Sequence, residues 1–255
     1  MNPLAQMLDP HAWASMLSSG WGDLDRAEFW LAVAKIIWIN ILLSGDNAVV
    51  IALACRGLPH RQRLWGMIIG AGVAVLLRVV FTGVFASLLL LPYLKIAGGL
   101  ALFYIAAKLL VPDEPDTSET EAVEHLWRAV RIVAVADIIM SLDNVIAIAA
   151  AANGNMALLV LGLAISIPLI VAGAAAIMAL LDRFPILVWA GAALLGWIVG
   201  EVIATDPVVT AYLVHAYSVA VAHTVEYAAA AVGAVLVLIV GALWRRSRLP
   251  KASDV

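Results

Sequence analysis

Long apolar stretches separated by short polar segments dominate the sequence. A helix needs roughly 20 apolar residues to cross the ~30 Å hydrocarbon core of a bilayer, and seven stretches reach about this length. They are Phe29–Cys55, Trp65–Leu91, Pro92–Val111, Ile132–Ala152, Met156–Leu181, Pro185–Thr205 and Ala216–Trp244. The pattern predicts an all-α polytopic membrane protein with seven transmembrane helices.

Composition supports this class. The 255 residues are 64% hydrophobic and 13% charged, whereas soluble domains are about 45–50% apolar. The net charge of −3 indicates no basic surface, so a nucleic-acid partner has no support. The single cysteine, Cys55, forms no internal disulfide and belongs to no metal-binding motif.

Two copies of one polar motif interrupt the apolar pattern, and each member of the second copy lies 97 positions after its counterpart. The first copy is Asn40, Ser44, Asp46 and Asn47, and the second is Asp137, Ser141, Asp143 and Asn144. A carboxylate at membrane depth costs at least ~2.5 kcal/mol, so it must face the protein interior and marks a candidate functional site.

The duplication extends beyond the motifs. Leu91-Pro92 matches Phe184-Pro185, and Ala97-Gly98 matches Ala190-Gly191. Each unit therefore contains three spans, and this odd number inverts the second unit relative to the first, as in many secondary transporters. The predicted division is an N-terminal interfacial or mobile segment (1–28), the first repeat (29–111), an acidic cytoplasmic linker (112–128), the second, inverted repeat (129–205), one extra C-terminal helix (206–244) and a basic cytoplasmic tail (245–255).

Helical geometry divides each motif. Asn40, Ser44 and Asn47 share one helix face, but Asp46 lies about 120° away, so we expect the backbone to depart from an ideal helix near Gly45. The second copy has leucine at the glycine position, which makes a break there less expected. Inversion pairs Asp46 with Asp137 at one depth and Asp143 with Asn40 at another, about 9 Å apart for six residues of helix rise.

Carboxylate, amide and hydroxyl oxygens are the ligands that hard divalent cations prefer, so the motifs predict a site for such an ion. The alternative for the serines and asparagines is interhelical hydrogen bonding, worth about 0.6 kcal/mol each.

Other charged residues also fall within apolar stretches. Arg78 is expected to be the counter-charge of the carboxylates when no ion is bound. Glu226 is a candidate for the ion site or for proton transfer, and His223 shares its helix face. Glu201 and Asp206, at the outer end of the sixth span, are expected to be solvated.

Basic residues predict the orientation. If the first span runs inward, eleven lysines and arginines lie on the cytoplasmic side and one, Arg26, lies outside. We therefore expect an outside N-terminus and a cytoplasmic C-terminus. The acidic linker between the third and fourth spans is expected to be a solvated tether, with cation attraction as the alternative.

With the residues Val49-Val50-Ile51-Ala52 that follow the first copy, the two motifs resemble those of the TerC family of integral membrane proteins. The resemblance covers roughly residues 30–240. It implies membership of the broader group of LysE-like exporters, manganese(II) efflux as the activity, and a link to tellurite resistance. The acidic positions of the family correspond to Asp46, Asp137 and Asp143, whereas Asn40 stands where members often carry an acid.

The sequence therefore predicts a non-enzymatic secondary transporter of the bacterial inner membrane that exports manganese(II) or a related divalent cation, driven by proton antiport. It has no tightly bound cofactor, and its partners are the transported ion and the bilayer, with a homo-oligomer left open. One alternative is a LysE-like amino-acid or organic-solute exporter. An intramembrane aspartyl protease is a weaker alternative. The two carboxyls of its catalytic dyad must lie ~3 Å apart, whereas the inverted repeat places Asp46 and Asp143 at different depths. A membrane partner without transport activity is a further alternative.

Overall fold

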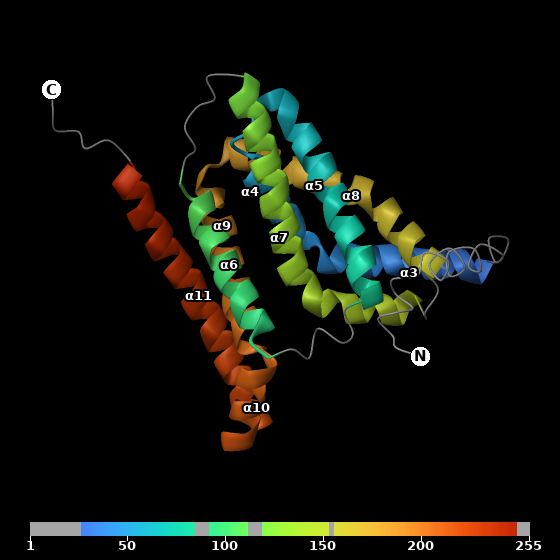
Figure 1. Cartoon of the computed structure of the whole chain (residues 1–255), viewed down its shortest axis with the longest axis vertical. Coiled ribbons are helices and arrows are strands. Elements are labelled where there is room, and N and C mark those ends of the chain that lie inside the picture. The colour runs from blue at the N-terminus through green and yellow to red at the C-terminus, as the bar shows by residue number, and fades with distance from the viewer. Residues whose placement is uncertain (1–26, 85–91, 112–118, 153–155, 249–255) are drawn as a thin grey trace.

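The computed structural model describes residues 27–84, 92–111, 119–152 and 156–248, with only the backbone for 81–84, 119–122, 142–147, 149–152 and 156. In these residues every regular element is a helix (Figure 1). The helices are α3 (Ala27–Leu43), α4 (Gly45–Cys55), α5 (His60–Val84), α6 (Leu94–Leu109), α7 (Glu119–Ala152), α8 (Met156–Arg183), α9 (Ile186–Ala204), α10 (Pro207–Ala216) and α11 (Val219–Arg248). The predicted 1–28 and 245–255 segments lie largely outside the described residues.

Each of the seven predicted spans coincides with a helix or, for the first, with the pair α3 and α4. Within the described residues, four helices (α5, α8, α9 and α11) are long and apolar enough to cross a membrane, and the bent pair makes a fifth candidate. Helix α6 has 16 residues, and α7 begins with a charged segment. A multi-pass helical membrane protein is therefore confirmed, while seven crossings remain a prediction.

The first motif breaks its helix. Helix α3 ends at Leu43, α4 begins at Gly45, and the two axes differ by 57°. Ser44 between them has φ −118° and ψ 9°, outside the helical region. This confirms the predicted departure from ideal geometry. The second copy has Leu142 at the glycine position, and α7 stays helical throughout, although Figure 1 shows its last part turning away from the axis of the first.

The first predicted span of each predicted repeat packs against the second predicted span of the other repeat. The α3/α4 pair packs against α8, and α7 packs against α5. The second spans, α5 and α8, contact each other, as do the third spans, α6 and α9. This exchange of partners is the contact pattern expected of two units related by a twofold axis.

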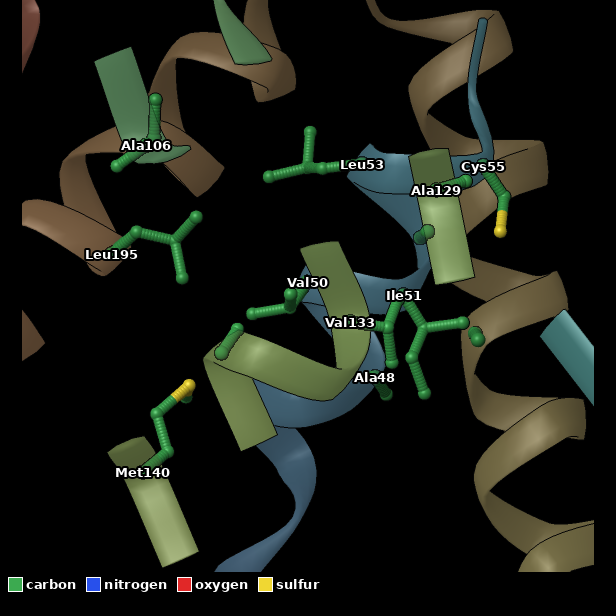
Figure 2. Packing of buried hydrophobic residues seen from close by; sticks show 14 of the residues in the cluster. Ala48, Val50, Ile51, Leu53, Cys55, Ala106, Ala129, Val133, Met140 and Leu195 are labelled. Atoms are coloured by element: carbon green, nitrogen blue, oxygen red, sulfur yellow. The ribbon is translucent and has the colours of Figure 1, made fainter. Parts of the chain in front are cut away.

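Two apolar clusters support these contacts. The larger gathers side chains of α4 to α9 and of α11, including Ile51, Met140 and Leu195 (Figure 2). The smaller surrounds Ile36 of α3 and Leu163 of α8. Along α3 and α4 the motif residues lie between members of the two clusters, so they form a polar layer between two apolar ones.

Small residues bring α11 against α9. A Cβ added at Gly196 would lie 2.6 Å from the carbonyl oxygen of Gly233, and one at Gly200 would lie 2.6 Å from the Cα of Ala230. Only glycine allows so close a backbone approach, as in other packed transmembrane helices. Helix α11 docks on α9 and α6, outside the exchange between the halves.

The segment around Asp206 differs from the prediction. Instead of a loop leading into one long span, it forms the separate helix α10 before α11 begins at Val219. Asp206 is fully buried rather than solvated, because its carboxylate accepts from the backbone nitrogens of Val208 (3.0 Å), Tyr93 (3.3 Å) and Ile96 (3.3 Å). It thus caps α10 and also binds the start of α6.

The segment predicted as an acidic linker overlaps the start of a helix. Helix α7 begins at Glu119, inside the segment 112–128, whereas residues 112–118 lie outside the described residues.

Candidate functional site

Arg78 of α5 is the centre of the polar layer, and its side chain is only 2% exposed. Nη1 donates to Asn40 Oδ1 (2.5 Å) and Ser44 Oγ (3.0 Å). Nε donates to Ser141 Oγ (3.2 Å), and Nη2 forms an ion pair with Asp137 Oδ1 (2.5 Å). One guanidinium therefore binds Asn40 and Ser44 of the first motif and Asp137 and Ser141 of the second. We call these four residues and Arg78 the Arg78 cluster.

Further hydrogen bonds within the cluster follow the repeat. Ser44 Oγ donates to Asn40 Oδ1 four residues earlier (3.2 Å), and Ser141 Oγ donates to Asp137 Oδ2 four residues earlier (3.1 Å). Residues four apart share a helix face, so each motif presents its hydroxyl beside its acid or amide. The two copies contribute equivalent pairs from opposite sides of Arg78.

Ser166 of α8 is a neighbour of the cluster that the sequence analysis missed. Its hydroxyl accepts from Asn40 Nδ2 (2.5 Å) and donates to the carbonyl of Leu163 (2.6 Å). The available signal was that Ser166 carries the only polar side chain in the apolar stretch 156–181. Through this bond α8 orients the Asn40 amide so that its oxygen faces Arg78.

Asp46 and Asn47 lie in the first turn of α4. Asp46 is half-buried, accepts from the backbone nitrogen of Asn47 (2.8 Å), and interacts electrostatically with Arg78 and Asp137. The positive end of the α4 dipole favours a carboxylate at this position. The break after α3 thus turns Asp46 onto a new helix start and keeps it within the electrostatic range of the cluster.

A small cavity adjoins the cluster. It measures about 10 Å³ and is lined by Asn47, Arg78 and Asp137 together with apolar side chains of α4, α5 and α8. Asn47 Nδ2 is buried there and has no hydrogen-bond partner among the described residues. A volume near ~10–15 Å³ is the minimum for one water molecule, so the cavity suits one water molecule or one small ion without its hydration shell.

Arg78 and Asp137 form a buried ion pair, and removing one partner of such a pair costs about 3–5 kcal/mol. Asp46 adds a second carboxylate nearby, so the described groups carry more negative than positive charge. Among the described side chains, no three acidic, histidine or thiol groups gather closely enough to hold a metal. The oxygens of the cluster are engaged by the guanidinium.

The other predicted site residues lie elsewhere or remain untested. The side chains of Asp143 and Asn144 lie outside the described residues, so the second predicted level stays a prediction. His223 Nδ1 lies 3.3 Å from Glu226 Oε2 on α11, with 69% and 25% of the side chains exposed. Helix α11 packs mainly on α9, α6 and α10, so these contacts do not bring Glu226 to Arg78.

Comparisons with known proteins identify a family that this chain matches. The model of the integral membrane protein TerC family matches residues 25–249. The uncharacterized membrane protein YjbE of Bacillus subtilis is 41% identical over 179 residues, covering 70% of this chain and 82% of YjbE. YceF, an uncharacterized membrane protein of the same organism, is 26% identical over 65% of this chain and 68% of its own length. No solved structure matches.

Proposed function

Because the chain belongs to the integral membrane protein TerC family, we propose that it is a secondary transporter that exports manganese(II) or a related divalent cation from the bacterial cytoplasm. The observation that carries the proposal is the buried Arg78 cluster, a charged and hydroxyl-rich layer between two apolar ones. Buried charges at membrane depth are costly and are typical of ion pathways. The names of the relatives give no substrate, so the choice of ion rests on the chemistry of the cluster.

The cluster holds oxygens of the type that a hard cation binds. Asp137, Asn40, Ser44 and Ser141 offer one carboxylate, one amide oxygen and two hydroxyls. Manganese(II) accepts such ligands, and no sulfur is needed. The Asp46 carboxylate, at the start of α4, supplies the second negative charge that a divalent ion requires.

Arg78 acts as a tethered substitute for the ion. Its guanidinium binds the same oxygens that the cation would bind, so ion and arginine exclude each other. When the ion arrives, Arg78 must withdraw along α5, and when the ion leaves, Arg78 returns and neutralises Asp137. The site is then never left with uncompensated buried carboxylates, which would cost several kcal/mol.

Alternating access follows from an inverted repeat. The exchanged packing of α3/α4 with α8 and of α7 with α5 supports two halves that rock about the polar layer. The break at Ser44 lets α3 and α4 move separately. In this arrangement the N-terminus is outside and the C-terminus is cytoplasmic in the inner membrane.

Proton entry drives export. The ligands of the ion act deprotonated, so ion binding releases protons and ion departure allows their uptake. We assign the coupling proton to Asp46 of the polar layer, because Asp137 is neutralised by Arg78 when the ion leaves, rather than to Glu226, which lies on α11.

The test is manganese(II) flux in proteoliposomes that contain a manganese indicator and a pH dye. The proposal predicts manganese movement accompanied by proton flux in the opposite direction, and loss of both in Asp137→Asn. The control is Asp182→Asn, which removes a half-exposed carboxylate paired with Arg63 and should leave flux unchanged. Flux of a radiolabelled amino acid without manganese flux would favour the LysE-like alternative, and no flux of either would refute transport of both.

A further inference from the structure

Ser166 lies where α8 packs against α3, and its side chain is fully buried. Figure 1 shows the two helices meeting at the right of the view. The Ser166 hydroxyl donates to the carbonyl of Leu163 (2.6 Å) and accepts from Asn40 Nδ2 (2.5 Å). A serine hydroxyl has a single proton to donate. Because Leu163 takes that proton, Ser166 can only accept from Asn40, and this holds the amide nitrogen of Asn40 toward α8.

The orientation of the Asn40 amide decides whether this side chain can bind a cation. The amide oxygen has lone pairs for a metal ion, whereas the NH₂ group is a donor. Two donors reach the oxygen, Arg78 Nη1 (2.5 Å) and Ser44 Oγ (3.2 Å), and Ser166 accepts from the nitrogen. All three contacts therefore turn the Asn40 oxygen toward the centre of the Arg78 cluster.

These three contacts differ once Arg78 withdraws to admit the ion. The guanidinium, which can only donate, then no longer holds the Asn40 oxygen. The Ser44 hydroxyl can donate to an oxygen or accept from a nitrogen, so it is compatible with both orientations of the amide. Ser166 still requires the amide nitrogen, because its own proton is bound to Leu163. Of the described contacts, it is the one that keeps the Asn40 oxygen toward an incoming ion.

We propose that Ser166 is a positioning residue of the ion site: by holding the amide nitrogen of Asn40, it makes Asn40 offer its oxygen to the cation. This role rests on the proposed function. Asn40 belongs to the first predicted repeat and Ser166 to the second, so the bond also makes ion affinity depend on the contact between α3 and α8. Movement that separates the two helices would release the amide and lower the affinity for the ion.

The experiment measures the initial rate of manganese(II) flux against manganese concentration in proteoliposomes of the full-length protein. Ser166→Ala should raise KM about 2- to 10-fold, the effect of one ordinary hydrogen bond, and leave the maximal rate unchanged. Ser166→Thr keeps the hydroxyl and should have the wild-type KM. Ser166→Cys replaces the hydroxyl by a weakly accepting thiol and should resemble Ser166→Ala.

The matched control is Ser247→Ala on α11. Ser247 Oγ also donates to the carbonyl three residues earlier, that of Trp244 (2.7 Å), but it lies outside the polar layer. Its loss should leave KM unchanged.

A double-mutant cycle with Asn40→Ala tests whether Ser166 acts through Asn40. Once the amide is absent, Ser166→Ala should have no further effect on KM. The positioning role alone is overturned if the wild type transports manganese and the two effects on KM add, or if Ser166→Ala changes only the maximal rate. A wild-type KM in Ser166→Cys would also overturn it, because side-chain volume would then suffice. If the wild type moves no manganese, the proposed function fails and the positioning role fails with it.

Discussion

At the residue scale, Arg78 decides how the polar layer is held together. Among the residues that the structure describes, it is the one guanidinium that contacts members of both motifs, and its ion pair with Asp137 is almost completely buried. A buried pair adds little net stability compared with apolar residues of the same volume, but it is costly to break. The energetics therefore favour a role in which Arg78 and a cation replace each other.

Replacing Arg78 by alanine should destabilise the ion-free protein more than the manganese-bound protein. Removing the guanidinium leaves Asp137 buried and unpaired, at a cost of about 3–5 kcal/mol, and a bound cation would offset that cost. The measurement is the Tm in detergent with and without manganese(II). Equal destabilisation in both conditions would make Arg78 purely structural.

Replacing Asp46 by asparagine should abolish manganese export while leaving the fold intact. The side chain keeps its shape, and the lost charge at the start of α4 is worth only about 0.3–1 kcal/mol. Efflux and Tm are measured together, with Asp182→Asn as the control for loss of a carboxylate. Export at the wild-type rate would remove Asp46 from the ion pathway.

The candidate site was predictable only in part. Matching motifs singled out Asn40 and Asp137, because polar residues repeated at one offset are conspicuous in an apolar chain. A carboxylate partner for Arg78 was expected, but its bonds to the Asn40 amide and the two serine hydroxyls could not be deduced, since they depend on how the helices pack. Asp206 was misjudged because its position at the end of a span suggests solvent, whereas its hydrogen bonds to three backbone nitrogens allow full burial.

At the scale of the elements, the break between α3 and α4 was predictable and the arrangement of α10 was not. Ser44-Gly45 combines a side chain that competes for backbone hydrogen bonds with a weak helix former. A Cβ at Gly45 would meet nothing within 4 Å, so the break depends on the motif rather than on space for glycine. Helix α10 starts with Pro207, which suits the first position of a helix, and Asp206 caps it.

Replacing Gly200 by alanine should weaken the docking of α11 on α9. The added Cβ would lie 2.6 Å from the Cα of Ala230, and such overpacking costs about 1–3 kcal/mol or more. The matched control is Gly72→Ala in α5, where a Cβ meets nothing within 4 Å. Both variants are compared by Tm. An equal Tm would contradict the close contact between the two helices.

At the scale of the whole molecule, a polar layer crosses a protein that is otherwise apolar inside. Helices of both predicted repeats supply the layer, and helices of one predicted repeat pack against helices of the other. Movement of one half against the other would therefore change the surroundings of Arg78 and of the carboxylates at the same time. This coupling between packing and charge is what a transporter with one central ion site requires.

The most direct test of the central claim is a structure of the protein with manganese(II), determined with anomalous diffraction at the manganese edge. We predict an anomalous peak at ligand distance from Asp137, within reach of the α4 start, with Arg78 displaced from Asn40 and Ser44. Saturating manganese with no peak in the polar layer, or a peak elsewhere with the ion pair between Arg78 and Asp137 intact, would contradict the claim.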